Sequence, residues 1–250
     1  MPLVNVNGNG WDWDNLVKIF GLQRSGTNFL SILLQENYNA RILVTTGGPK
    51  HDHYQVPLHL GMELKSIVCT KNPYAWIASI HKYCKEHNLQ DNPPPIKDFI
   101  RDRFTLRRTL MGSPIKKFYT YTTNRAANPI QYWNNYGYHW LKQADSITVP
   151  YLIVQYEQLL KEPEEYSNAV ANLLKLERND NDFYIPQKRL KGWGEAPNRN
   201  NATEDKTFSR KDYFINKQYL NLFDKEDIEF INNELDYEVM DALSYEKEIL

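Results

Sequence analysis

Short apolar segments alternate with longer amphipathic segments along most of the chain. Apolar runs typical of buried strands occupy residues 16–20, 41–45, 66–70 and 146–155. Between them the apolar residues follow helical spacing, and residues 25–37 are the clearest case, with Phe29, Leu30 and Leu33 on one face. Strands that alternate with helices form parallel βαβ units. The pattern therefore predicts an α/β fold with a central parallel sheet flanked by helices.

Prolines set several of the expected helix boundaries. Proline is favoured at the first helical position, so helices are predicted to begin at Pro73 and Pro129 and to run to about residues 87 and 142. Residues 156–176 are expected to be mostly helical around a break at Pro163. Residues 185–207 are polar and are expected to be irregular, whereas the chain from Asp212 onward has the pattern of charged amphipathic helices.

No feature of the pattern divides the chain into separate domains. There is no internal repeat and no long linker, so a single domain over residues 1–250 is the simplest interpretation. The three prolines at 93–95 mark a loop, and residues 88–128 are interpreted as a lid or insertion. The stretch from 96 to 128 mixes basic and aromatic residues, which suits a cover over an acidic ligand.

Composition limits the function classes. Hydrophobic residues make up 41% and charged residues 24%, as is usual for a soluble globular protein. The net charge of −1 offers no general attraction to nucleic acid or to an anionic membrane, so neither is expected as a partner. Two cysteines do not form a disulfide framework, and no apolar run resembles a signal peptide or approaches the roughly 20 residues of a membrane span. A cytoplasmic protein without a membrane span is expected.

The residues between the first predicted strand and the first predicted helix form a candidate phosphate loop. Their sequence is Gly21-Leu-Gln-Arg24-Ser25-Gly26-Thr27-Asn28. A glycine-bearing loop in this place can point backbone N–H groups at a phosphate, and the helix N-terminus adds partial positive charge. Gly21 and Gly26 have the spacing of the nucleotide P-loop, but Thr27 stands where that motif has its lysine. An NTP-dependent P-loop kinase is therefore the less favoured alternative.

Two later segments also combine a strand end with residues suited to a nucleotide. Lys71-Asn72-Pro73 follows the predicted strand 66–70, and Ser79 lies about two turns along the next helix. Further on, residues 151–155 form an apolar strand that runs directly into Tyr156 and Glu157. Lysine offers an anion a point charge without the bidentate fork of arginine.

These three segments resemble the cofactor-binding motifs of the PAPS-dependent sulfotransferases (PAPS is 3′-phosphoadenosine-5′-phosphosulfate). Arg-Ser-Gly-Thr at 24–27 is similar to the 5′-phosphosulfate loop of carbohydrate and bacterial members. Lys71-Asn72-Pro73 with Ser79 resembles the family's Arg-Asn-Pro and serine of the 3′-phosphate site, with Lys71 in place of Arg. The segment around Tyr156 resembles the family's "(R)YEDL" block, with Gln155 and Gln158 replacing its Arg and Asp.

The resemblance implies a P-loop-like sulfotransferase fold that binds PAPS as co-substrate and releases PAP, with no metal required. The cofactor-binding residues that it implies are Arg24, Ser25, Gly26, Thr27, Asn28, Phe29, Lys71, Ser79, Tyr156, Lys191 and Gly192. Phe29 and Tyr156 would lie near the adenine. Lys191 and Gly192 would belong to a late loop, residues 185–211, that closes over the cofactor.

Sulfuryl transfer needs a base for the acceptor proton and a cation at the leaving oxygen. Arg24 is the cation that matches the family. His51 is the expected base, because Lys50-His51 resembles the Lys-His of bacterial relatives. His53 and Glu36 are the alternatives. The implied acceptor is a hydroxyl or amine of a small molecule or a carbohydrate.

Other constellations point to simpler roles. The spacing of His81, Cys84 and His87 does not place all three on one helix face, so a metal site is not expected. The aromatic residues of the helix that begins at Pro129 are expected in the core rather than as a sugar-binding platform; they are Tyr132, Trp133, Tyr136, Tyr138 and Trp140. A catalytically inactive, PAP-binding relative of the sulfotransferases is the second alternative, beside the kinase.

Overall fold

The computed structural model describes most of the chain and groups it into two units. The described residues are 4–6, 15–43, 50–51, 65–87, 94–104, 126–143, 151–186, 189–190, 202–203 and 210–249. The first unit, here the sheet unit, comprises Met1–Asn72 and Lys142–Gln218. The second, here the helical unit, comprises Pro73–Leu141 and Tyr219–Leu250. Each unit combines two separate stretches of the sequence.

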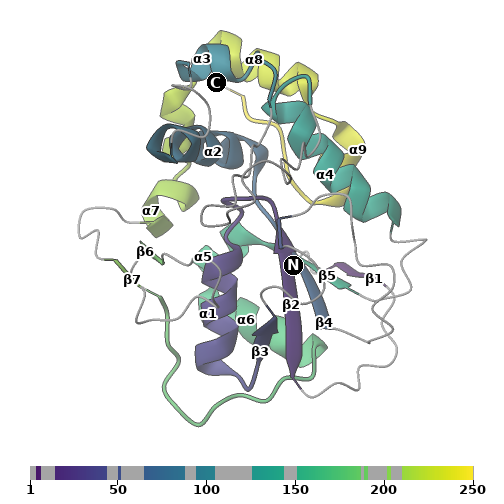
Figure 1. Cartoon of the computed structure of the whole chain (residues 1–250), viewed down its shortest axis with the longest axis vertical. Helices are drawn as coiled ribbons and strands as arrows, with labels where there is room; N and C mark the ends of the chain where they lie inside the picture. Colours follow the sequence, from purple (N-terminus) through teal and green to yellow (C-terminus); the bar gives the residue numbers. More distant parts are fainter. Residues whose placement is uncertain are drawn as a thin grey trace, which may run out of the picture. The chain divides into compact units, whose positions relative to one another are not determined.

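The sheet unit contains a five-stranded sheet in the order β1-β5-β4-β2-β3 (Figure 1). Its strands are β1 (Val4–Val6), β2 (Leu16–Gly21), β3 (Arg41–Leu43), β4 (Lys65–Thr70) and β5 (Tyr151–Gln155). Strands β3, β2, β4 and β5 pair in parallel, and β1 pairs antiparallel with β5 at one edge. The predicted α/β class with a central parallel sheet is confirmed.

Helices of the sheet unit lie against this sheet. They are α1 (Thr27–Asn37), α5 (Tyr156–Lys161), α6 (Pro163–Leu173) and α7 (Arg210–Ile215). Helix α1 packs on β2, β3 and α6, and α5 packs on α6 and α7. A short antiparallel pair, β6 (Arg189–Leu190) with β7 (Ala202–Thr203), is also present. The core is continuous through the sheet, because every residue of β4 and β5 is buried.

The helical unit has an aromatic core. Its elements are α2 (Pro73–His87), α3 (Ile96–Phe99), α4 (Pro129–Gln143), the 3₁₀ helix η2 (Gln218–Leu222), α8 (Lys225–Glu234) and α9 (Tyr237–Ala242). Trp76 of α2 stacks on Tyr132 of α4 with ring centroids 6.0 Å apart, and Phe104 meets both rings edge-on. Of the helices that the structure describes, none has the length and apolar character to cross a membrane.

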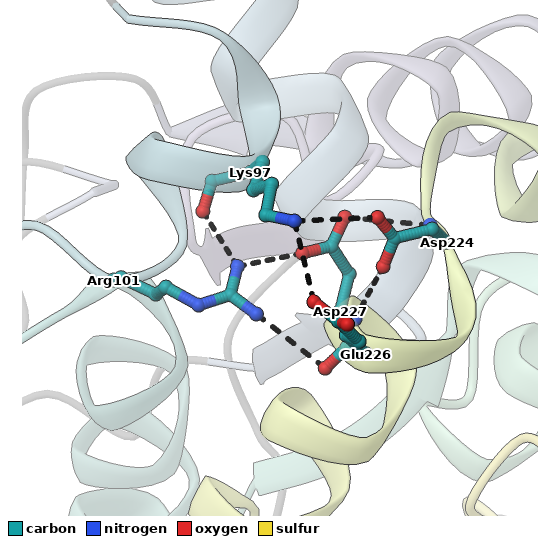
Figure 2. A network of polar contacts seen from close by, with 5 residues as sticks. All are labelled: Lys97, Arg101, Asp224, Glu226 and Asp227. Carbon is teal, nitrogen blue, oxygen red and sulfur yellow. Dashed lines mark hydrogen bonds and ion pairs between the residues drawn. The ribbon is translucent and has the colours of Figure 1, made fainter.

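An ion-pair network joins α3 to the start of α8 within the helical unit (Figure 2). Arg101 Nη1 lies 2.6 Å from Oδ1 of Asp227, whose side chain is buried. Lys97 Nζ pairs with the exposed carboxylates of Asp224 and Glu226 at 3.6 and 3.3 Å. Asp224 and Asp227 also form a capping box that satisfies backbone N–H groups at the α8 N-terminus.

The predicted element boundaries agree closely with the structure. Helix α2 begins at Pro73 and α4 at Pro129, because proline lacks only an N–H that a first turn leaves unpaired. Pro163 starts α6 directly after α5, as the predicted break requires. The predicted start of the first helix at Ser25 is two residues early, since Gly26 has a left-handed conformation and α1 begins at Thr27. The expected irregular stretch 185–207 includes the short β6–β7 pair.

Candidate anion-binding site of the sheet unit

Three candidate segments meet at one edge of the parallel sheet. In the strand register Gly21 of β2 lies opposite Cys69 of β4, and Thr70 of β4 lies opposite Gln155 of β5. The carboxyl ends of the three strands therefore coincide, and the residues that follow each strand emerge side by side. Ligands of open α/β sheets bind at this edge. The sequence separated these segments by tens of residues, and the sheet brings them together.

The loop from Gly21 to Thr27 is tight, and two of its positions have no room for a side chain. A Cβ atom at Gly21 would collide with the side chains of Ser25 and Thr27. Gly26 has φ of 96°, and a Cβ there would collide with the Tyr156 ring. Arg24 also has positive φ, 71°, which is costly for a residue with a side chain. The backbone of the loop is therefore strained at Arg24.

The loop leads into a helix N-terminus that suits an anion. Gly26 caps α1 without any side-chain hydrogen bond, and the first turn of α1 contains no acidic residue. The first N–H groups of a helix have no partner within the helix and carry partial positive charge. Ser25 Oγ is buried and has no hydrogen-bond partner among the described residues. A buried hydroxyl of this kind is usually satisfied by a ligand or a water molecule.

Lys71 is the buried cation of the site. Its side chain is held from several sides: Nζ donates to the Arg24 carbonyl oxygen at 3.4 Å and lies 4.9 Å from the centroid of the Tyr156 ring. Burial lowers the pKa of Lys71 well below its ordinary value of 10.5, while the nearby carboxylate of Glu157 acts in the opposite direction. Glu157 is itself positioned by the backbone N–H of Asn72, which donates to Oε1 at 3.0 Å. An anion bound beside Lys71 would favour its charged form and raise its pKa.

Helix α7 contributes residues that the sequence analysis missed. Phe214 lies with its ring centroid 3.7 Å from Lys71 Nζ and meets Tyr156 edge-on at 5.4 Å. The Arg210 guanidinium lies 5.3 Å from the centroid of the Phe29 ring, and Phe29 meets Tyr156 edge-on at 6.1 Å. Arg210 falls at the end of the predicted closing loop 185–211, and Phe214 falls in the segment from Asp212 that was assigned to charged amphipathic helices, so neither was named as a site residue. Arg210 adds a third cation to those of Arg24 and Lys71.

His51 and Lys50 contact the loop and the first turn of α1. His51 Nδ1 is 2.7 Å from the carbonyl oxygen of Gly21, so this nitrogen carries a proton and donates. In the neutral ring Nε2 is then the nitrogen that can accept a proton. Lys50 Nζ donates to Asn28 Oδ1 at 2.5 Å. Burial, reinforced by the charge of Lys50, lowers the pKa of Lys18 in β2 to about 8.

Most of the predicted site residues are brought together in this one unit. The residues of the sheet unit lie in the loop, at the strand ends or in contact with them; they are Arg24, Ser25, Gly26, Thr27, Asn28, Phe29, Lys71, Tyr156 and His51.

The other predicted residues are not brought to this edge by the described structure. Ser79 belongs to the helical unit, where its hydroxyl donates to the Ala75 carbonyl of α2 at 2.7 Å. Lys191, Gly192 and His53 lie outside the described residues, as do most of 88–128 and of 185–211. Glu36 lies near the far end of α1, about 12 Å along the axis from Asn28, which argues against it as a base.

The side chains at this edge have the charge and polarity that an anion requires. Within the described part of the chain, histidine, cysteine and acidic residues form no group of three or more that could hold a metal ion. The cationic groups Arg24, Lys71 and Arg210, with the α1 N-terminus, could hold a phosphorylated or sulfated ligand. Comparison with family models, with curated proteins and with solved structures gave no match.

Proposed function

We propose that the chain is a sulfotransferase that moves a sulfuryl group from PAPS to a hydroxyl or amine of a small molecule or a carbohydrate and releases PAP. The observation that carries the proposal is the meeting of three sulfotransferase-like segments at one sheet edge. Lys71 of the second segment contacts the Arg24 carbonyl of the first and the Tyr156 ring of the third. A chance resemblance of three short sequences would not require this contact.

In this proposal, different groups of the site bind the two anionic ends of PAPS. The loop 24–27 and the α1 N-terminus suit the 5′-phosphosulfate, because backbone N–H groups and Arg24 converge there. Lys71 and Arg210 suit the 3′-phosphate, with Phe29 and Tyr156 as aromatic neighbours for the adenine. Arg210 is included because of its position beside Phe29, and not because of the family resemblance.

Transfer proceeds by in-line attack, in which positioning and electrostatics supply most of the catalysis. His51 Nε2 takes the proton of the acceptor hydroxyl, and the acceptor oxygen forms a bond to sulfur. The bond from sulfur to the bridging oxygen of PAPS breaks, and its electron pair stays on the 5′-phosphate of PAP. Arg24 stabilises that developing charge. The Gly21 carbonyl holds His51 in the tautomer that this step needs.

The two alternatives differ in measurable ways. An NTP-dependent kinase would need a lysine after Gly26 and a hydroxyl for Mg²⁺, and the chain has Thr27 and Asn28 there. An inactive relative would bind PAP without turnover. This alternative rests on the replacements Lys71 and Gln155 relative to the family pattern.

Thermal unfolding with PAP in metal-free buffer, beside ATP with Mg²⁺, tests the cofactor. A ligand at about 100 times its dissociation constant adds roughly 2.7 kcal/mol to the free energy of unfolding, which is a visible shift. We expect PAP to stabilise the protein and Mg-ATP to have no comparable effect. Arg24→Met should remove the shift, and Arg41→Met, which changes an exposed arginine of β3, should keep it. Stabilisation by Mg-ATP alone would replace this proposal with the kinase.

A further inference from the structure

In the helical unit α4 runs beside the turn between α8 and α9 (Figure 1). A polar pocket is lined by residues of α4 and of this turn. Its volume is about 440 Å³, within the usual range for small-ligand sites. The lining residues are Gln131, Asn134, Asn135, Tyr138, Glu234 and Asp236. All of them belong to the helical unit, so the pocket is formed without any part of the sheet unit.

Hydrogen bonds fix the wall of this pocket. Glu234 Oε2 accepts from Asn128 Nδ2 and from Gln131 Nε2, each at 3.0 Å. Asn134 is buried, donates from Nδ2 to the Glu234 carbonyl at 2.7 Å and accepts at Oδ1 from the Asp236 N–H at 3.1 Å. The polar groups are thereby held in place before any ligand arrives, which lowers the entropic cost of binding.

The same residues keep hydrogen-bonding capacity for a ligand. Glu234 Oε1, Gln131 Oε1 and the Asn135 amide make no hydrogen bond within the part of the chain that the structure describes. Asp236 uses Oδ1 to cap α9, and its Oδ2 has no partner among the described residues. The pocket thus offers several acceptors together with an amide that both donates and accepts.

Tyr138 is the aromatic residue of the pocket lining. The other aromatic residues of α4, namely Tyr132, Trp133, Tyr136 and Trp140, are buried as predicted. Tyr138 differs, because 52% of its surface is exposed and it lines the pocket. The expectation that all five rings belong to the core is therefore wrong for Tyr138: it lies on the side of α4 that faces away from the core.

We propose that this pocket binds a neutral hexopyranose sugar. A sugar ring presents neighbouring hydroxyls that donate to carboxylates and exchange hydrogen bonds with amides, and its C–H face packs on an aromatic ring. Glu234 and Asp236 repel phosphate and sulfate, so an anionic nucleotide does not fit. A bare divalent cation finds too few ligands, since no described group of three acidic, histidine or cysteine residues exists. This binding site does not depend on the proposed sulfotransferase activity.

Saturation-transfer NMR of the full chain with lactose, cellobiose and maltose, each at about 10 mM, tests the proposal in the millimolar range of affinity. We expect saturation of the ring protons of at least one sugar. Tyr138→Ala and Asn135→Ala change exposed residues of α4 and should each weaken binding about tenfold or more. Tyr237→Ala, at a tyrosine that is 69% exposed in the same unit, is the matched control and should bind as the parent protein does.

Three results would overturn the proposal. They are no saturation with any of the three sugars, binding that survives both α4 substitutions, and displacement of the sugar by millimolar Ca²⁺. The shift of thermal unfolding by PAP should stay unchanged in Tyr138→Ala, so failure of the sugar site and failure of the proposed cofactor are read out separately. The unfolding midpoint of each variant shows whether it has folded.

Discussion

The ammonium nitrogen of Lys71 lies 3.7 Å from the centroid of the Phe214 ring. Lys71 follows β4, and Phe214 comes from α7, far along the chain. The ring covers a cation that is only 3% exposed and that lies at the edge where the candidate phosphate loop begins. Burial lowers the pKa of this ammonium, so we expect anion binding at this edge to depend on pH.

At a pH near or above the pKa of Lys71 in the free protein, anion binding should be accompanied by proton uptake at Lys71. Its pKa in the free protein lies well below 10.5 because of burial, and a bound phosphate would raise that pKa. Affinity for PAP should be constant below the pKa of the free protein and should fall as the pH rises above it. Calorimetry in two buffers of different ionisation enthalpy measures the proton uptake. Lys71→Met should abolish it, and Lys161→Met, at an exposed lysine, should not. Equal uptake in Lys71→Met would assign it to another group.

Arg24→Gly should separate stability from binding. Glycine removes the cost of positive φ, about 1–2 kcal/mol, but adds chain entropy in the unfolded state, so we expect a net stabilisation of about 0.5 kcal/mol. Lys175→Gly is the matched control, because Lys175 is also basic and exposed and has φ of 51°. Urea unfolding should show a similar gain for both. Only Arg24→Gly should lose PAP binding, and retained binding would show that Arg24 acts through its backbone alone.

His51→Ala should reduce turnover while leaving PAP affinity within about twofold. General-base catalysis typically contributes about 10²- to 10⁴-fold, and this is the expected loss in kcat. The measurement is transfer from PAPS to an accepted hydroxyl, once an acceptor has been found. His81→Ala is a control, because His81 belongs to the helical unit and contacts the Pro94 carbonyl. Unchanged turnover in His51→Ala would mean that another residue is the base.

The two basic residues of the α3–α8 network should contribute unequally to stability (Figure 2). Arg101→Met leaves the buried Asp227 carboxylate without its ion pair, so the free energy of unfolding should fall by about 1–3 kcal/mol. Lys97→Met removes contacts to exposed carboxylates that water already screens, and its effect should be much smaller. Urea unfolding of both variants checks this order. Equal losses would show that burial of Asp227 does not govern the network.

Much of the fold could be predicted from local signals. Pro73 and Pro129 start helices where they stand, and Pro163 separates α5 from α6, because these effects depend on a single residue's missing N–H and fixed φ. The shift of α1 from Ser25 to Thr27 was not predicted, since sequence does not reveal that Gly26 adopts φ of 96° under the Tyr156 ring.

The division of the chain is not visible in the sequence. Each unit draws on two stretches that are far apart, with Lys142–Gln218 returning to the sheet and Tyr219–Leu250 joining α2 and α4. No composition change or linker in the sequence marks where the chain passes from one unit to the other. Contacts between distant segments define the units, and such contacts are not recorded in local periodicity.

By itself the sequence determined the alternation of strands and helices, the loop from Gly21 to Asn28, and the placing of Lys71 and Tyr156 directly after strands. These follow from neighbouring residues, because hydrophobic periodicity and turn residues act over a few positions. Only the tertiary structure decided that Phe214 and Arg210 of α7 cover Lys71 and Phe29, and that Tyr138 alone among the aromatics of α4 is exposed. Burial depends on which segments pack together, and that is a property of the whole chain rather than of any one segment.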